Sequence, residues 1–347
     1  MLSENKSSPK TEGTTQSTEL SLDETATKTD NSKNLDQSTQ DKQNLKLTSK
    51  PTMSAALQKH CKEIEDSFKR YKWDHSNCES IEWKHVRNSV QGRPLFWTVF
   101  GNESEHKAKQ YNATMILCGV HGDEITPIKF CFDVINHFKN SGYDFNDQLL
   151  VVAPVVNPDS YFKKKPTRTN ARGIDINRNF PTKDWWKKAR QLWKSWYRKD
   201  KRRNPGRKPI SEPEVLFQVN LIKRYRPAKI ISVHAPLTMI DYDGPAKNNN
   251  EMITNKDKSA NQLLIQMSQK AAGYRVKNYR VFPGSLGNYA GNERNIPTYT
   301  LELPTSDYTK SDQYWKLFKE SIDHAVKYDF RRLSYTGKQQ DNSNKPN

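Results

Sequence analysis

Apolar and polar positions follow two different periods along this chain. In residues 54–71 apolar side chains recur at helical spacing, as Leu57, Cys61, Ile64 and Phe68, which predicts an amphipathic helix. Residues 81–90 and 94–101 instead alternate between apolar and polar positions on either side of the turn sequence Gln91-Gly92-Arg93-Pro94. This second pattern predicts a β-hairpin.

Beyond the hairpin, short apolar runs alternate with helical patterns. The runs predict strands at residues 114–118, 149–155, 229–233 and 298–303, and the patterns predict helices at residues 127–138, 211–225, 262–272 and 313–328. The second of these helices begins at Ser211-Glu212-Pro213-Glu214, which combines a capping residue with an early proline and acids in the first turn. Alternating strands and helices predict one α/β domain, with a mostly parallel or mixed central sheet flanked by helices.

Composition sets the limits of this domain. Residues 1–50 are mostly Ser, Thr, Lys, Asp, Gln and Asn and include no aromatic residue, so they cannot bury enough apolar surface to offset chain entropy. We therefore expect disordered polar tails at residues 1–52 and 336–347, and a folded domain at residues 53–335.

The predicted domain is strongly basic. The formal net charge of the chain is +18, and the first 50 residues hold 7 lysines and 8 acids, so 50 Lys and Arg face 31 Asp and Glu in the rest. Such an excess favours an anionic partner: nucleic acid, acidic lipid or an acidic polymer.

The expected compartment follows from what the first residues and the cysteines show. The first thirty residues contain no secretory signal and no run approaches the roughly 20 apolar residues of a membrane span, so a soluble cytoplasmic protein is expected. The periplasm or cell envelope is the alternative if an export signal was removed. Cys118 and Cys131 lie in apolar runs and are interpreted as packing residues, whereas Cys61 and Cys78 have the option of pairing in an oxidising compartment.

Residues able to bind a metal stand where predicted strands end. His121 and Glu124 follow the strand at residues 114–118, His234 follows the strand at residues 229–233, and Glu302 lies inside the last apolar strand. Ligands gather at the carboxyl ends of parallel strands, and zinc binds imidazole nitrogen and carboxylate oxygen. His-x-x-Glu alone is common by chance, but an acid inside an apolar strand is costly and points to a function or a partner.

Taken in order, these motifs resemble the zinc metallocarboxypeptidases, and within them the murein peptide amidase branch, which cuts the γ-D-glutamyl–diaminopimelate bond of cell-wall peptides. The resemblance rests on His121-Gly-Asp-Glu124, Arg168-x-Asn170, Asn177-Arg178-Asn179-Phe180-Pro181, Ser211-Glu-Pro-Glu214, His234-Ala-Pro-Leu237, the stretch from Phe282 to Tyr289, and Leu301-Glu302. It covers most of residues 92–304 and implies the zinc-carboxypeptidase fold.

The resemblance also implies a role for each matching residue. The implied roles are zinc ligands for His121, Glu124 and His234, general base for Glu302, carbonyl polarisation for Arg168, and binding of the substrate's terminal carboxylate for Asn177 and Arg178. One Zn²⁺ per chain is expected. Tyr289 is either the mobile active-site tyrosine of the family or a packing aromatic, and Arg172 is interpreted as solvated.

Some features depart from the family pattern. Ser160 replaces a usual glycine, and Ala235 replaces an acid that some members carry, which bears on the substrate side chain rather than on the chemistry. Residues 185–208 interleave tryptophans with basic residues, so they form either a surface helix with inward tryptophans or a docking surface for an anionic polymer such as peptidoglycan.

The resemblance implies a zinc-dependent hydrolase that removes C-terminal meso-diaminopimelate from peptidoglycan stem peptides. A carboxypeptidase for ordinary C-termini, a zinc deacylase related to the aspartoacylases, and a non-catalytic basic cell-wall-binding protein remain as alternatives. Peptidoglycan or a muropeptide is the expected partner, with no nucleic acid and no membrane span, and the chain is expected to be a monomer.

Overall fold

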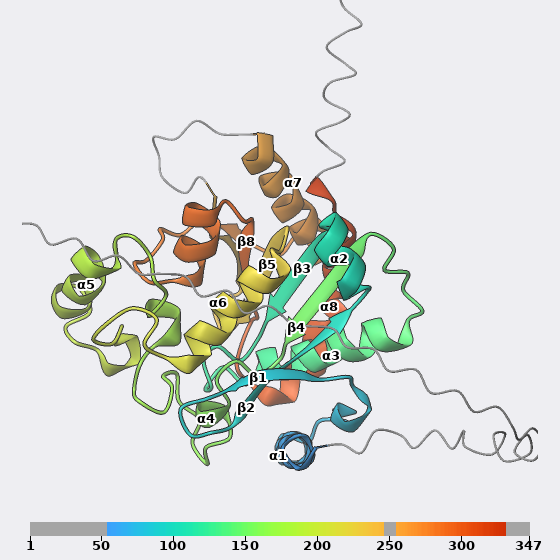
Figure 1. The fold of residues 1–347 in the computed structure, drawn as a ribbon, viewed down its shortest axis with the longest axis horizontal. Helices are drawn as coiled ribbons and strands as arrows, with labels where there is room; N and C mark the ends of the chain where they lie inside the picture. Colours follow the sequence, from blue (N-terminus) through green and yellow to red (C-terminus); the bar gives the residue numbers. More distant parts are fainter. Residues whose placement is uncertain (1–53, 246–254, 331–347) are drawn as a thin grey trace, which may run out of the picture. The chain divides into compact units, whose positions relative to one another are not determined.

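The computed structural model describes residues 54–245 and 255–330, whose strands form one mixed eight-stranded sheet (Figure 1). The strands are β1 (Lys84–Asn88), β2 (Pro94–Phe100), β3 (Asn112–Leu117), β4 (Gln148–Ala153), β5 (Lys229–His234), β6 (Met239–Tyr242), β7 (Val276–Lys277) and β8 (Thr298–Glu302). They lie in the order β1-β2-β4-β3-β5-β8-β6-β7. The four central strands β4, β3, β5 and β8 run parallel, while β2 and β6 flank them in the antiparallel sense. The predicted α/β class with a mixed sheet is confirmed.

Helices cover both faces of this sheet. They are α1 (Ala55–Arg70), α2 (Glu103–Lys109), α3 (Thr126–Asn140), α4 (Pro158–Tyr161), α5 (Arg190–Ser195), α6 (Pro213–Tyr225), α7 (Asn255–Lys270) and α8 (Ser311–Lys327). Successive residues of a strand point to opposite faces. On β3, Ile116 therefore belongs to the core shared with α1, α3, α7 and α8, and Met115 to the core shared with α6. Figure 1 shows α6 crossing one face of the sheet.

Most predicted elements are present at nearly the predicted positions. The pattern missed four short elements: α2 is polar, α4 has four residues, β7 has two, and β6 carries the acid Asp241 among apolar residues. α5 lies in the segment at residues 185–208, where a surface helix was one of two alternatives. The predicted cap of α6 is wrong. Glu212 occupies the N-cap position and makes no side-chain capping bond, while the Ser211 backbone N–H donates to Asn179 Oδ1 over 2.9 Å.

All four cysteines form disulfides. Cys61 on α1 pairs with Cys78, as the sequence allowed. Cys118 pairs with Cys131, so their interpretation as packing residues is wrong. The reason is local: the chain turns back after β3, and α3 lies against that strand's end, which brings the two Cα atoms to 6.3 Å. Sequence spacing alone does not show that approach.

Some predictions fall outside the described residues. The tails at 1–52 and 336–347, with the proposed limits at 53 and 335, belong to this group. Within the described ranges, no helix combines the length and the apolar character needed to cross a membrane.

Candidate metal centre and active site

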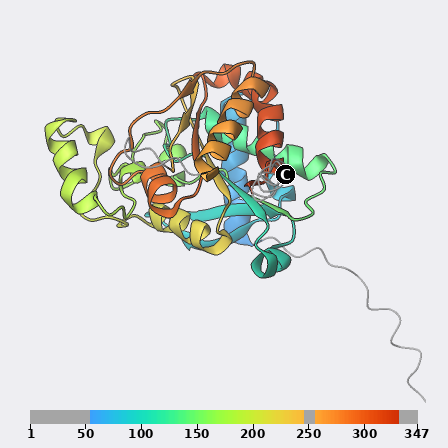
Figure 2. The ribbon, with the colours of Figure 1, turned by 90° about the horizontal axis from the view of Figure 1, so that it is seen from above.

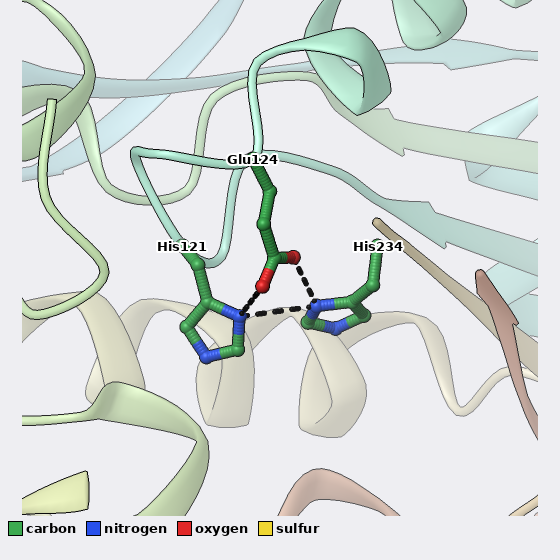
Figure 3. A group of neighbouring side chains, drawn as sticks. All are labelled: His121, Glu124 and His234. Carbon is green, nitrogen blue, oxygen red and sulfur yellow. Dashed lines mark hydrogen bonds and ion pairs between the residues drawn. The ribbon is translucent and has the colours of Figure 1, made fainter. Parts of the chain in front are cut away.

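Two imidazoles and one carboxylate meet at a single point (Figure 3). His121 Nδ1 lies 2.8 Å from Glu124 Oε1, His234 Nδ1 lies 2.8 Å from Glu124 Oε2, and the two Nδ1 atoms are 3.2 Å apart. One potential ligand atom from each residue falls within 4.8 Å of the others, and all three side chains are buried. Among the described residues, no other group of three His, Cys, Asp or Glu side chains brings its potential ligand atoms this close together.

Strand ends and a tight loop bring these ligands together. His121 and Glu124 lie in the loop between β3 and α3, where a Cβ added at Gly122 would approach Tyr161 N to 2.6 Å, so the loop packs too closely for a side chain there. His234 ends β5. It pairs in register with Glu302, the last residue of β8, which sets the predicted base beside the third ligand.

The other ring nitrogen of each histidine also has a partner. His121 Nε2 donates to Asp175 Oδ1 over 3.2 Å, and His234 Nε2 lies 2.9 Å from Ser232 Oγ. With the proton on Nε2, each Nδ1 lone pair faces the centre, as metal ligation requires. The sequence reasoning missed Asp175, although an acid between Ile174 and Ile176 was a signal that it is buried.

The surroundings of Glu124 and Asp175 favour the ionised form of each carboxyl group. Burial works against ionisation of Glu124, but the charges and hydrogen bonds of His121 and His234 outweigh it and hold the pKa of this carboxyl well below its usual range. Asp175 behaves alike: burial is outweighed by Arg168 and His121, so its pKa is lowered. Two imidazole nitrogens and an ionised carboxylate are a donor set that zinc prefers, so the residues fit this ion.

Glu302 sits at the edge of the same cavity, with only 9% of its surface exposed. Burial, the largest influence, and the charge of Glu124 raise its pKa, while His234 and the Leu237 N–H oppose the rise. That N–H donates to Glu302 Oε2 over 3.4 Å. A carboxylate with a raised pKa is a better proton acceptor near neutral pH than an exposed one.

Three of the predicted site residues, Arg168, Asn177 and Arg178, line this cavity, whose volume is about 630 Å³. Arg168 donates from Nη1 to Glu124 Oε1 and from Nε to Asp175 Oδ2, both over 3.1 Å. Asn177 accepts from the Leu286 N–H over 2.8 Å. Arg178 is buried, and within the described residues its Nε has no hydrogen-bond partner.

Two asparagines pin the segment that carries these residues. Asn170 Nδ2 donates to Glu212 Oε2 over 2.7 Å and to Glu214 Oε2 over 3.0 Å. Asn179 Nδ2 donates to the carbonyls of Pro205 and Lys208 over 2.8 and 2.9 Å. The acids that begin α6 therefore hold the segment next to Arg168 instead of capping the helix, while backbone carbonyls hold the segment next to Arg178.

Tyr289 is a correction to the predicted site. Its side chain is 1% exposed, packs against Phe180 with 5.4 Å between ring centroids, and does not line the cavity, so the packing alternative applies. The aromatic residues that line the cavity are Tyr279 and Phe282, and the Phe282 ring lies 4.5 Å from the Arg178 guanidinium carbon. Arg172 lies elsewhere: its side chain is 53% exposed and donates to the Ser211 carbonyl.

The lining of the cavity carries both signs of charge. Asp241 and Asp243, from β6 and the residues after it, line the cavity together with Arg280. Asp241 Oδ1 accepts from the Tyr279 N–H over 2.7 Å, and Asp243 accepts from the Thr300 hydroxyl. The cavity therefore provides acids and a guanidinium within one volume.

With this geometry described, comparison with known proteins defines the class. The family model described as zinc carboxypeptidase matches residues 75–330. The chain belongs to the zinc carboxypeptidase family and is a hydrolytic enzyme with a zinc cofactor.

The chain is also similar to two murein peptide amidases in sequence and to a carboxypeptidase in fold. Murein peptide amidase A of Escherichia coli strain K12 is 32% identical over 225 residues, which cover 64% of this chain and 81% of that protein. Murein peptide amidase A of Vibrio campbellii is 30% identical over 218 residues, which cover 62% and 77%. The crystal structure of carboxypeptidase A from Helicoverpa armigera superposes with a TM-score of 0.57 at 19% identity, covering 77% of this chain and 70% of that one, and so shares the fold.

Proposed function

We propose that this enzyme removes C-terminal meso-diaminopimelate from peptidoglycan stem peptides by hydrolysing the γ-D-glutamyl–diaminopimelate bond. The observation that carries the proposal is the mixed charge of Asp241, Asp243 and Arg280 in the cavity that also contains the candidate metal ligands and Glu302. The names of the two murein peptide amidases that it resembles support the same substrate class.

Diaminopimelate explains why both charges are needed. Its side chain ends in a free ammonium and a second carboxylate, so a matching pocket must provide an anion and a cation together. Asp241 and Asp243 suit the ammonium, and the Arg280 guanidinium suits the carboxylate. A pocket for an apolar C-terminal side chain needs no charge, and one for lysine or arginine needs only the acids.

The proposed roles follow from the positions of the side chains. His121, Glu124 and His234 would hold the zinc ion, which would supply polarisation of the scissile carbonyl and a more acidic water. Glu302 takes a proton from the attacking water and delivers it to the leaving amine as the carbon–nitrogen bond breaks.

Two arginines complete the proposed site. Arg168 stabilises the negative charge that develops on the carbonyl oxygen. Arg178, whose buried Nε lacks a partner in the described residues, binds the terminal carboxylate together with Asn177.

Mass spectrometry of defined muropeptides tests the reaction and the substrate together. We expect release of diaminopimelate from a tripeptide stem, no release once a fourth residue blocks the terminus, loss of activity with a chelator and recovery on addition of zinc. Glu302→Gln should keep zinc and the fold but lower turnover by several orders of magnitude.

The alternatives predict other outcomes. Release of C-terminal lysine or phenylalanine from ordinary peptides, with the tripeptide left intact, would identify a general carboxypeptidase. Binding of cell wall without release of any product, in zinc-loaded protein, would identify a non-catalytic wall-binding protein.

For the compartment we propose an oxidising one outside the cytoplasm. Disulfides persist there and are rare in the cytosol, and both cysteine pairs are bonded. Protein taken directly from cells and unfolded in an alkylating reagent, without reductant, should be labelled at none of the four cysteines. Labelling of all four cysteines under the same conditions would instead favour the cytoplasm.

A further inference from the structure

Exposed apolar side chains gather around the mouth of the active-site cavity. Of the seven large apolar side chains exposed in the described residues, Leu237 (51%) and Tyr279 (49%) line the cavity, and Trp196 (66%) lies beside it. Trp196 contacts Arg280, a residue that lines the cavity and whose guanidinium carbon lies 5.0 Å from the indole centroid. Exposed apolar surface concentrated in one place marks a binding site more often than scattered side chains do.

Guanidinium groups alternate with these apolar side chains. Arg202 and Arg203 line the cavity with side chains 60% and 41% exposed. Arg202 Nη1 donates to Asp123 Oδ2 over 2.7 Å, which ties this part of the chain to the loop holding His121 and Glu124. We call the six residues Trp196, Arg202, Arg203, Leu237, Tyr279 and Arg280 the rim.

The rim continues into a second hollow. Arg280 and Phe282 line both the active-site cavity and a neighbouring hollow of about 290 Å³, whose other wall is formed by residues around α5, including Leu192 and Ser195. Figure 2 shows the segment around α5 projecting from the side of the sheet and helices. A substrate larger than a tripeptide therefore has a continuous surface along which to extend from the reacting bond.

We propose that the rim binds the amino sugars that a stem peptide carries in peptidoglycan, so that the enzyme prefers glycan-linked peptides to free ones. This proposal rests on the proposed function. A pyranose ring presents a face of C–H groups, which packs on the rigid apolar face of an indole, and Trp196 offers such a face to solvent. Of the rim arginines, Arg280 is assigned to the diaminopimelate side chain, and Arg202 and Arg203 match the remaining negative charge of the stem peptide.

Paired tryptophan variants provide the test. Trp196→Ala removes the stacking surface, and Trp186→Ala removes an indole of the same segment that is equally exposed, at 68%, but lies outside the rim and contacts Trp185. In a Glu302→Gln background, which prevents turnover, calorimetric titration should show disaccharide-tripeptide binding about tenfold weaker for Trp196→Ala. The free tripeptide should lose much less affinity than the disaccharide-tripeptide in Trp196→Ala, whose only effect on it is the lost contact with Arg280, and Trp186→Ala should match the parent for both ligands.

Each other result overturns the proposal. Equal affinity of the parent for the free and the disaccharide-linked tripeptide would do so, as would equal losses for the two tryptophan variants. A single-stranded DNA oligonucleotide that loses more affinity than the disaccharide-tripeptide in Trp196→Ala would assign the rim to nucleic acid instead. If the wild-type enzyme releases no diaminopimelate, the proposed function fails, but the titrations still decide the rim because they measure binding alone.

Discussion

At the scale of single residues, Asp175 connects the metal ligands to the substrate side of the cavity. Its buried carboxylate accepts from His121 Nε2 over 3.2 Å, from Arg168 Nε over 3.1 Å and from the Asn177 N–H over 3.0 Å. One acid thus orients a ligand and two residues of the proposed substrate site. Its ionised form is favoured because Arg168 and His121 lower its pKa despite burial.

Asp175→Asn should therefore weaken zinc binding without unfolding the protein. The amide has the same shape but lacks the charge that holds the His121 proton on Nε2, and partners of this kind contribute about 10–100-fold to metal affinity. Competition with a chromophoric chelator at neutral pH measures the change. Ser232→Ala is the matched control, because it removes the uncharged partner of His234 and should cost less. Unaltered zinc affinity in Asp175→Asn would rule out this positioning role.

At the scale of elements, the sequence predicts where the strands end but not which distant loops pack beside those ends. His234 and Glu302 could be placed at carboxyl ends from the apolar runs alone, and the β5–β8 register brings them side by side. The position of the loop from Phe282 to Tyr289 could not be predicted from such runs. A Cβ at Gly284 would meet the Arg178 carbonyl oxygen at 2.1 Å, and this crossing of two distant segments brings Phe282, rather than Tyr289, to the cavity. Contacts over such separations leave no periodic signal.

The Cys118–Cys131 disulfide encloses the loop with His121 and Glu124, so removing it should affect both stability and metal binding. A cross-link closing a loop of this size contributes roughly 3 kcal/mol to the free energy of unfolding. Replacing both cysteines by alanine should lower the urea midpoint accordingly and weaken zinc binding, because the ligand loop gains freedom. The Cys61–Cys78 pair is the control: its double alanine variant should lose similar stability but keep its zinc affinity. Equal zinc affinity in both variants would contradict the coupling.

At the scale of the whole molecule, two buried groups oppose each other as the pH falls. Burial and the charge of Arg93 lower the pKa of His60 from 6.5 to about 3. Burial raises the pKa of Asp133 from 3.8 to about 6, against the opposing charge of Lys129. Between these values the unfolded chain takes up a proton at position 60 that the folded protein does not, and the folded protein takes up one at Asp133 that the unfolded chain does not. The first destabilises the fold on acidification and the second stabilises it.

His60→Leu should separate these two contributions. In the wild type, His60 lowers the free energy of unfolding by about 1 kcal/mol per pH unit as the pH falls below about 6.5 towards 3. The variant lacks this loss, so its stability relative to the wild type should rise by about 1 kcal/mol between pH 6 and pH 5. Asp133→Asn should shift the opposite way over that interval, because it lacks the stabilising proton uptake. Urea unfolding at each pH gives both differences, and titration of the metal ligands cancels because the proteins share it. Parallel stability curves for wild type and His60→Leu would show that His60 ionises as readily in the folded protein as in the unfolded chain.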